Sequence, residues 1–128
     1  MPRSTVLLID DDALRSHARM DALQHEFHAV RRCASAAEAF ILLEQADVAD
    51  AVALAIVALR RPGLSRPEFV RELAARLPGR TVVVLGGLAE VEREYSGEHV
   101  RFLQPGTPMR EMLRAVRMGL GGALSEAA

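Results

Sequence analysis

Apolar residues gather in five short runs along the chain, separated by longer stretches in which apolar positions recur at helical spacing. Runs of this length are typical of buried strands. The third run is apolar throughout, as expected of a central parallel strand that is covered on both faces. The pattern predicts strands over Thr5–Ile9, His28–Cys33, Ala51–Ala58, Thr81–Leu85 and Val100–Leu103.

The stretches between these strands carry the start and stop signals of helices. Asp12 is placed to cap the first helix, and Ser35 and Glu38 form a capping box at the start of the second. Gly121-Gly122 is expected to end the last helix. The predicted helices run from Ala13 to about Gln24, from Ser35 to about Gln45, from Pro67 to Leu77, from about Leu88 to Tyr95, and from Thr107-Pro108 to about Leu120.

The order of the predicted elements is a strand followed by a helix, five times over. Such alternation implies parallel strands joined by right-handed crossovers. We therefore predict an α/β fold, a three-layer (βα)5 domain with a doubly wound parallel five-stranded sheet. Residues 1–122 would form this single domain, and residues 123–128 a tail or the start of a linker.

Length and composition limit the class of protein and its cellular location. The 128 residues suit one domain, and the single cysteine cannot form an internal disulfide. No stretch approaches the ~20 unbroken apolar residues of a membrane span, and no secretory leader is recognisable. The net charge of −1 argues against direct nucleic-acid binding by this domain. We expect a cytoplasmic protein with no membrane contact.

Two absences bear on chemistry. All sixteen basic residues are arginines, so the chain contains no lysine. The last aspartate is Asp50, so no aspartate stands anywhere in the second half of the chain.

The aspartate triplet Asp10–Asp12 follows the first predicted strand, at the sheet edge where such folds place their functional crevice. A Pro62-Gly63 turn follows the third strand and a Gln104-Pro105 pair follows the fifth. With the strand–helix order, these features make the chain resemble the receiver domain of two-component response regulators over nearly its whole length. The resemblance implies a flavodoxin-like (CheY-like) fold.

The resemblance also implies a phosphorylation pocket. In that family an aspartate at the end of the third strand accepts a phosphoryl group, and two acids after the first strand help to hold Mg²⁺. A Thr or Ser after the fourth strand and a Lys after the fifth bind the phosphoryl oxygens. An aromatic residue near the fifth strand acts as a switch.

Carried onto this chain, most of these roles fall on residues that cannot perform them. The acidic pair is Asp10 and Asp11, but the acceptor position falls on Ala58, or on Ala55 if the register is counted from Asp50. The hydroxyl position falls on Gly86 and the lysine position on Gln104. The switch position falls on Arg101, with Phe102 beside it.

The resemblance therefore points to a degenerate pocket that is not phosphorylated at the family position. Asp10 and Asp11 would form at most a weak, vestigial Mg²⁺ site, since two carboxylates without a third ligand hold Mg²⁺ weakly. We expect no catalytic residue, no metal and no cofactor. With no lysine to balance the acids, at least one of these carboxylates is expected to have either a raised pKa or an arginine neighbour, for which Arg60 and Arg61 are the candidates.

Other candidate signals are weaker. His17, Asp21 and His28 come near one helical face, but His28 is expected to lie beyond the helix end, which argues against a metal site. Cys33 is expected to be an unactivated strand residue near the surface.

A pair of oppositely charged helices suggests a partner surface. The predicted helix over 88–95 carries Glu90, Glu92 and Glu94, and the last helix carries Arg110, Arg114 and Arg117 at i, i+4 and i+7. In receiver domains the surface formed by helix 4, strand 5 and helix 5 often mediates dimerisation. The two helices could pair across a two-fold axis, or could simply be solvated faces.

We predict a pseudo-receiver, a phosphorylation-independent module for protein interaction or dimerisation in bacterial signal transduction or transcription control. One alternative is a ligand-sensing module that binds a small molecule in the emptied pocket, with arginines favouring an anion and the acids opposing it. Another is an active receiver whose acceptor was changed to Ala for study, which the missing Lys and Thr disfavour.

Overall fold

The computed structural model, which describes residues 3–60, 66–86, 99–104 and 106–127, contains one five-stranded parallel sheet. Its strand order is β2-β1-β3-β4-β5, so the chain winds outward from β1 in both directions. All five predicted strands are confirmed, with bounds that differ by at most one residue. They are β1 (Thr5–Asp10), β2 (Ala29–Cys33), β3 (Val52–Ala58), β4 (Thr81–Leu85) and β5 (Val100–Leu103).

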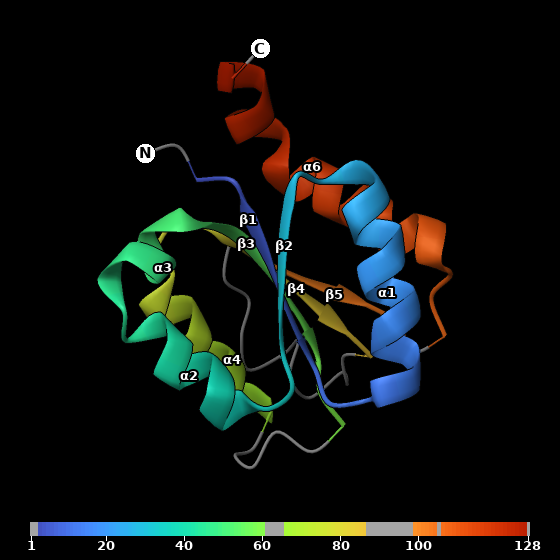
Figure 1. Cartoon of the computed structure of the whole chain (residues 1–128), viewed down its shortest axis with the longest axis horizontal. Coiled ribbons are helices and arrows are strands. Elements are labelled where there is room, and N and C mark those ends of the chain that lie inside the picture. The colour runs from blue at the N-terminus through green and yellow to red at the C-terminus, as the bar shows by residue number, and fades with distance from the viewer. Residues whose placement is uncertain (1–2, 61–65, 87–98, 105, 128) are drawn as a thin grey trace.

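Helices cover both faces of this sheet (Figure 1). The helices α1 (Ala13–Glu26) and α6 (Met109–Ala127) lie on one face. The helices α2 (Ala36–Leu43), α3 (Ala46–Ala51) and α4 (Arg66–Arg76) lie on the other. The predicted three-layer α/β fold is therefore confirmed. The helix expected over 88–95 lies outside the described residues.

Two predicted helix starts are formed as expected. The Asp12 side chain accepts hydrogen bonds from the backbone N–H groups of Leu14 and Arg15, both at 3.1 Å. At the start of α2, the Ser35 hydroxyl accepts from the Glu38 N–H at 3.1 Å, and the Glu38 carboxylate accepts from the Ala34 N–H at 3.3 Å. The capping box is thus reciprocal, although its return bond reaches one residue further back than the N-cap.

Two helical segments differ from the prediction. The short helix α3 was not anticipated, because a six-residue segment is too brief to show a helical period, although its three alanines favour helix. The expected end of the last helix at Gly121-Gly122 is wrong, since α6 continues to Ala127. Glycine costs a helix only about 1 kcal/mol relative to alanine, so two glycines weaken the helix without ending it. Residues 123–127 therefore extend α6.

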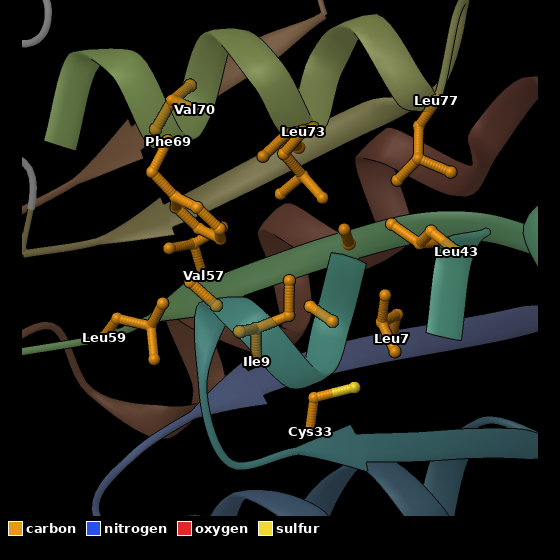
Figure 2. Packing of buried hydrophobic residues seen from close by; sticks show 14 of the residues in the cluster. Leu7, Ile9, Cys33, Leu43, Val57, Leu59, Phe69, Val70, Leu73 and Leu77 are labelled. Carbon is orange, nitrogen blue, oxygen red and sulfur yellow. The ribbon is translucent and has the colours of Figure 1, made fainter. Parts of the chain in front are cut away.

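The core consists of two clusters separated by the sheet. Side chains alternate along the central strands, so that Leu7 and Ile9 of β1 face α2 and α4 while Val6 and Leu8 face α1 and α6. Figure 2 shows the first cluster, where Phe69 and Leu73 of α4 pack down onto the sheet. Among the described helices, none has the length and apolarity that crossing a membrane would require.

Cys33 belongs to the first cluster. Its sulfur points into the packed side chains in Figure 2, and the residue is only 1% exposed. The expectation that it lies near the surface is therefore wrong. Its end of β2 is covered by α2, which a residue-by-residue reading of a short strand does not reveal. Burial raises the pKa of the Cys33 thiol to about 11, so the thiol stays protonated and unreactive in the folded chain.

Candidate functional site

The carboxyl ends of β1, β3, β4 and β5 bring the predicted pocket residues together at one edge of the sheet. Asp10, the last residue of β1, is the direct strand neighbour of Ala58, the last residue of β3. Ala55, by contrast, pairs with Leu7 in the buried middle of the sheet. The structure therefore places Ala58, and not Ala55, at the pocket.

A cavity of about 610 Å³ opens beside these strand ends. Ala58, Gly86 and Gln104 all line it, so three predicted pocket positions meet in space. Gly86 has a positive φ of 74°, and a Cβ built there would meet no described atom within 4 Å. The space that a side chain at this position would enter is open.

Asp10 is fully buried, and both of its carboxylate oxygens accept hydrogen bonds. The Oδ1 atom accepts from the Asp12 N–H at 3.0 Å, and the Oδ2 atom accepts from the Arg19 Nη1 at 2.7 Å. The Asp10 carbonyl accepts from the Arg32 Nη2 at 3.0 Å. Arg19 itself is largely buried, with 17% of its side chain exposed. A buried carboxylate is thus compensated by a nearly buried guanidinium.

Asp11 joins the ends of two strands. Its two carboxylate oxygens lie 3.1 and 3.0 Å from the backbone nitrogen of Arg60, the second residue after β3. Since the donor is a backbone N–H, this contact fixes the path of the chain as it leaves β3 and does not depend on the Arg60 side chain.

Asp12 caps α1 and also attracts two arginines. The Arg60 Nη2 lies 3.0 Å from the Asp12 Oδ2, and the Arg15 Nε lies 3.7 Å from the same oxygen. The pKa of the Asp12 carboxyl is lowered, chiefly by the hydrogen bond from the Arg15 backbone N–H and further by the Arg60 charge. The capping prediction and the expected Arg60 neighbour are both found at this residue.

The arginine that compensates Asp10 was missed. The expectation named Arg60 or Arg61, but the guanidinium of Arg60 pairs with Asp12, and Arg61 lies outside the described residues. The partner of Asp10 is Arg19, two turns into α1. Arg15, Ala18 and Arg19 follow the acidic triplet at i, i+3 and i+4, a spacing that places all three on one helix face. That spacing was the available signal.

The remaining predicted residues are spread over several surfaces. Arg101 is exposed on β5, where it pairs in register with Val83, and the neighbouring Phe102 packs against the first core cluster. Arg110 and Arg114 are exposed on α6, whereas Arg117 forms a salt bridge with Glu26 of α1. The acidic residues Glu90, Glu92 and Glu94 lie outside the described residues.

The histidines do not converge on a metal site in the described part of the chain, which contains no group of three metal-ligating side chains. The His25 Nε2 lies 3.9 Å from the Asp21 Oδ2, one helical turn away on the exposed face of α1.

Comparison with known proteins places the fold. No family model and no curated protein matches the chain. Among solved structures, a CheY-like response regulator receiver domain protein from Methanospirillum hungatei JF-1 is 18% identical, covering 96% of this chain and 98% of its own, with a TM-score of 0.81. The signal receiver domain of an HD domain-containing protein from Pseudomonas fluorescens Pf-5 is 23% identical, with coverages of 96% and 98% and a TM-score of 0.79.

A structure of adenylate cyclase from Rhodopirellula baltica is equally similar, at 23% identity, coverages of 96% and 90%, and a TM-score of 0.80. Likeness at these identities establishes the fold. This chain has the fold of response regulator receiver domains, and what it does has to be argued from its own pocket and surfaces.

Proposed function

We propose that this chain is a pseudo-receiver, a receiver-like domain that acts without phosphorylation as a protein-interaction or dimerisation module in bacterial signal transduction or transcription control. It performs no catalytic step of its own. The observation that carries the proposal is Ala58 at the end of β3, in register with Asp10. A methyl group has no oxygen with which to attack phosphorus.

Two further positions of the cavity, Gly86 and Gln104, also support the proposal that the chain is not phosphorylated. Gly86 offers no hydroxyl, and Gln104 carries no positive charge, although both line the cavity beside Ala58. Transfer of a phosphoryl group depends on groups that position it and stabilise its charge. Here both the acceptor and two of the groups that would hold the phosphoryl oxygens are absent.

A divalent cation fits this arrangement poorly. Mg²⁺ requires near-octahedral oxygen ligation. The Asp10 oxygens already accept from Arg19 and from the Asp12 backbone, the Asp11 oxygens accept the Arg60 N–H, and the Ala58 side chain offers no ligand. We infer that Arg19 supplies the positive charge beside Asp10 permanently, and that the domain needs no metal.

The basic face of α6 is the surface that we propose for a partner. Arg110 and Arg114 lie one turn apart, both exposed, and neither forms a salt bridge with a described carboxylate. Arg117 contributes less, because Glu26 already binds it. An acidic surface, on another protein or on a second copy of this chain, would complement this face and speed the encounter.

Incubation with acetyl phosphate and Mg²⁺, followed by intact-mass measurement, tests the first half of the proposal. We expect no phosphoryl adduct under conditions in which an aspartate-bearing receiver domain is modified. An adduct on this chain would overturn the proposal.

Light scattering across protein concentration tests the second half. We expect self-association that the pair Arg110→Glu and Arg114→Glu weakens, while the pair Arg31→Glu and Arg71→Glu, at exposed positions of β2 and α4, serves as the charge-matched control. A chain that stays monomeric at every concentration would remove the homodimer and leave only a heterologous partner.

A further inference from the structure

Two chemically distinct sets of side chains line the cavity beside Ala58. The first set consists of arginines from α1 and from the segment after β3, namely Arg15, Arg19 and Arg60. The second set is apolar and consists of Ala18, Leu85, Met109 and Met112. A volume of about 610 Å³ lies within the roughly 300–1,000 Å³ range of small-molecule sites.

The acids of the triplet do not make the cavity negative. Asp10 is covered by Arg19, so these two charges cancel where the cavity meets α1. Asp11 is not among the described lining residues, and both its oxygens accept the Arg60 N–H. Asp12 is then shared by Arg15 and Arg60. The three arginines Arg15, Arg19 and Arg60 therefore balance the three carboxylates of the triplet.

The two arginines beside Asp12 are accessible. The Arg15 side chain is 66% exposed and the Arg60 side chain 63% exposed, and each lies beside a single carboxylate oxygen of Asp12. A guanidinium has five N–H donors, so one contact leaves most of its donors available. Both arginines can therefore donate to an incoming anion while keeping Asp12.

The apolar lining residues can adapt to a ligand. Methionine side chains fill irregular spaces because they are unbranched and polarisable. Met112 is buried, with 2% exposure, and Met109, one turn earlier on the same helix, is half-buried. Gly86 lines the same cavity, and a Cβ built there would meet no described atom within 4 Å. An apolar group placed there would leave water and contact apolar side chains, which is favourable by about 25 cal/mol per Å² of area.

We propose that this cavity binds a small monocarboxylate with an apolar body. The carboxylate would receive hydrogen bonds from Arg15 and Arg60, and the body would lie against Leu85, Met109 and Met112. Arg15 and Arg60 already lie beside one carboxylate, that of Asp12, and a guanidinium matches a planar carboxylate with two parallel hydrogen bonds. This site is independent of the phosphorylation-independent role proposed above, and either can fail without the other.

The test uses octanoate as the probe, with octanamide as its uncharged match and acetate as an anion without an apolar body. In a chain labelled with ¹³C-methyl methionine, we expect octanoate to shift the Met109 and Met112 signals and to leave that of Met118, which is 54% exposed on the outer face of α6. Octanoate should also raise the thermal unfolding midpoint, because a ligand of the native state stabilises it.

Two variants locate the site. Ala18→Phe places a large side chain at the cavity from an exposed helix position, and Ala37→Phe on α2 is the matched exposed control. We expect the first to abolish the methionine shifts and the second to keep them. Arg60→Gln should weaken octanoate binding about tenfold, as loss of a charge-assisted hydrogen bond does, while Arg114→Gln should not.

Several outcomes would overturn the proposal. They are equal responses to octanoate and octanamide, shifts that persist in Ala18→Phe, and shifts confined to Met118. No response to octanoate at millimolar concentration in the wild-type chain would overturn it as well. If Ala18→Phe does not fold, the comparison of Arg60→Gln with Arg114→Gln decides, since both are exposed arginines.

Discussion

The guanidinium of Arg19 lies 2.7 Å from a carboxylate oxygen of Asp10, a residue that has no contact with solvent. This pair links α1 to the end of β1 and neutralises the most deeply placed acid of the triplet. Removing one partner of such a pair leaves an uncompensated buried charge, which costs more than the pair itself contributes.

Arg19→Gln is therefore expected to lower the free energy of unfolding by about 2 kcal/mol or more. Urea denaturation measures the loss, with Arg71→Gln on the exposed face of α4 as the control, for which surface substitution predicts a change within about 0.5 kcal/mol. Adding Asp10→Asn to Arg19→Gln should restore part of the stability, because the buried charge is then gone. A double variant as unstable as the sum of the singles would contradict the pairing.

The same substitution should change the response to Mg²⁺. In the wild-type chain we expect Mg²⁺ at millimolar concentration to leave the thermal unfolding midpoint unchanged, because Arg19 occupies Asp10 Oδ2. In Arg19→Gln the freed carboxylate, beside Asp11, can attract the cation, and the midpoint should rise on Mg²⁺ addition. Ca²⁺ and Na⁺ at matched ionic strength separate ligation from screening. An equal rise in both proteins would show that Arg19 does not take the place of the metal.

The lowered pKa of Asp12 predicts that the stability of the folded chain depends on pH. Its pKa is lowered in the folded chain by the Arg15 N–H and by Arg60, relative to about 3.9 in an unfolded chain. The stabilisation is therefore fully present above the unfolded pKa and is lost as the pH falls through the folded pKa. Asp12→Asn keeps a capping residue without the charge, so it should be less stable than the wild type at pH 7 and approach it near pH 3.

Circular dichroism melts at the two pH values measure this difference. Asp47→Asn is the matched control, since Asp47 is exposed on α3 and forms no salt bridge with a described residue. A gap between wild type and Asp12→Asn that is the same at pH 7 and pH 3 would show that the charge of Asp12 is not what stabilises the chain.

Substitution of glycine by alanine is expected to have opposite effects on stability at two sites of α6, Gly119 and Gly121. A Cβ at Gly119 would come within 2.6 Å of the Leu54 Cδ1 and 2.9 Å of the Thr81 Cγ2, where the helix crosses β3 and β4. Gly119→Ala should destabilise the chain by about 1–3 kcal/mol, as overpacking does. A Cβ at Gly121 would meet nothing within 4 Å, so Gly121→Ala should stabilise the helix by up to about 1 kcal/mol. Thermal melts of the two variants, with opposite shifts, check both expectations.

The sequence predicted the strands well, because each is a short apolar run bounded by polar residues, and it predicted the caps at Asp12 and Ser35 from local chemistry alone. It did not predict α3 or the extension of α6, because neither shows a clear boundary signal. The burial of Cys33 depends on the packing of α2 over β2, and no local pattern reports that.

Within the pocket, positions that depend on strand order could be predicted. Ala58, Gly86 and Gln104 follow successive strands, and parallel strands bring such residues to one edge. The charge pairing could not be predicted in full. Which arginine reaches Asp10 depends on the angle at which α1 leaves β1, and this angle is set by the packing of α1 against the sheet and α6.

The hydrogen bonds from the Arg60 backbone N–H to the Asp11 carboxylate bear on how domains of this fold are recognised from sequence. Each aspartate of the triplet performs a task that needs no phosphoryl group: one is an internal counter-charge, one fastens two strands and one starts a helix. Loss of any of the three is therefore expected to destabilise the domain, whether or not it is phosphorylated. Acids after the first strand therefore report architecture, and a diagnosis of activity has to begin from the residue that ends the third strand.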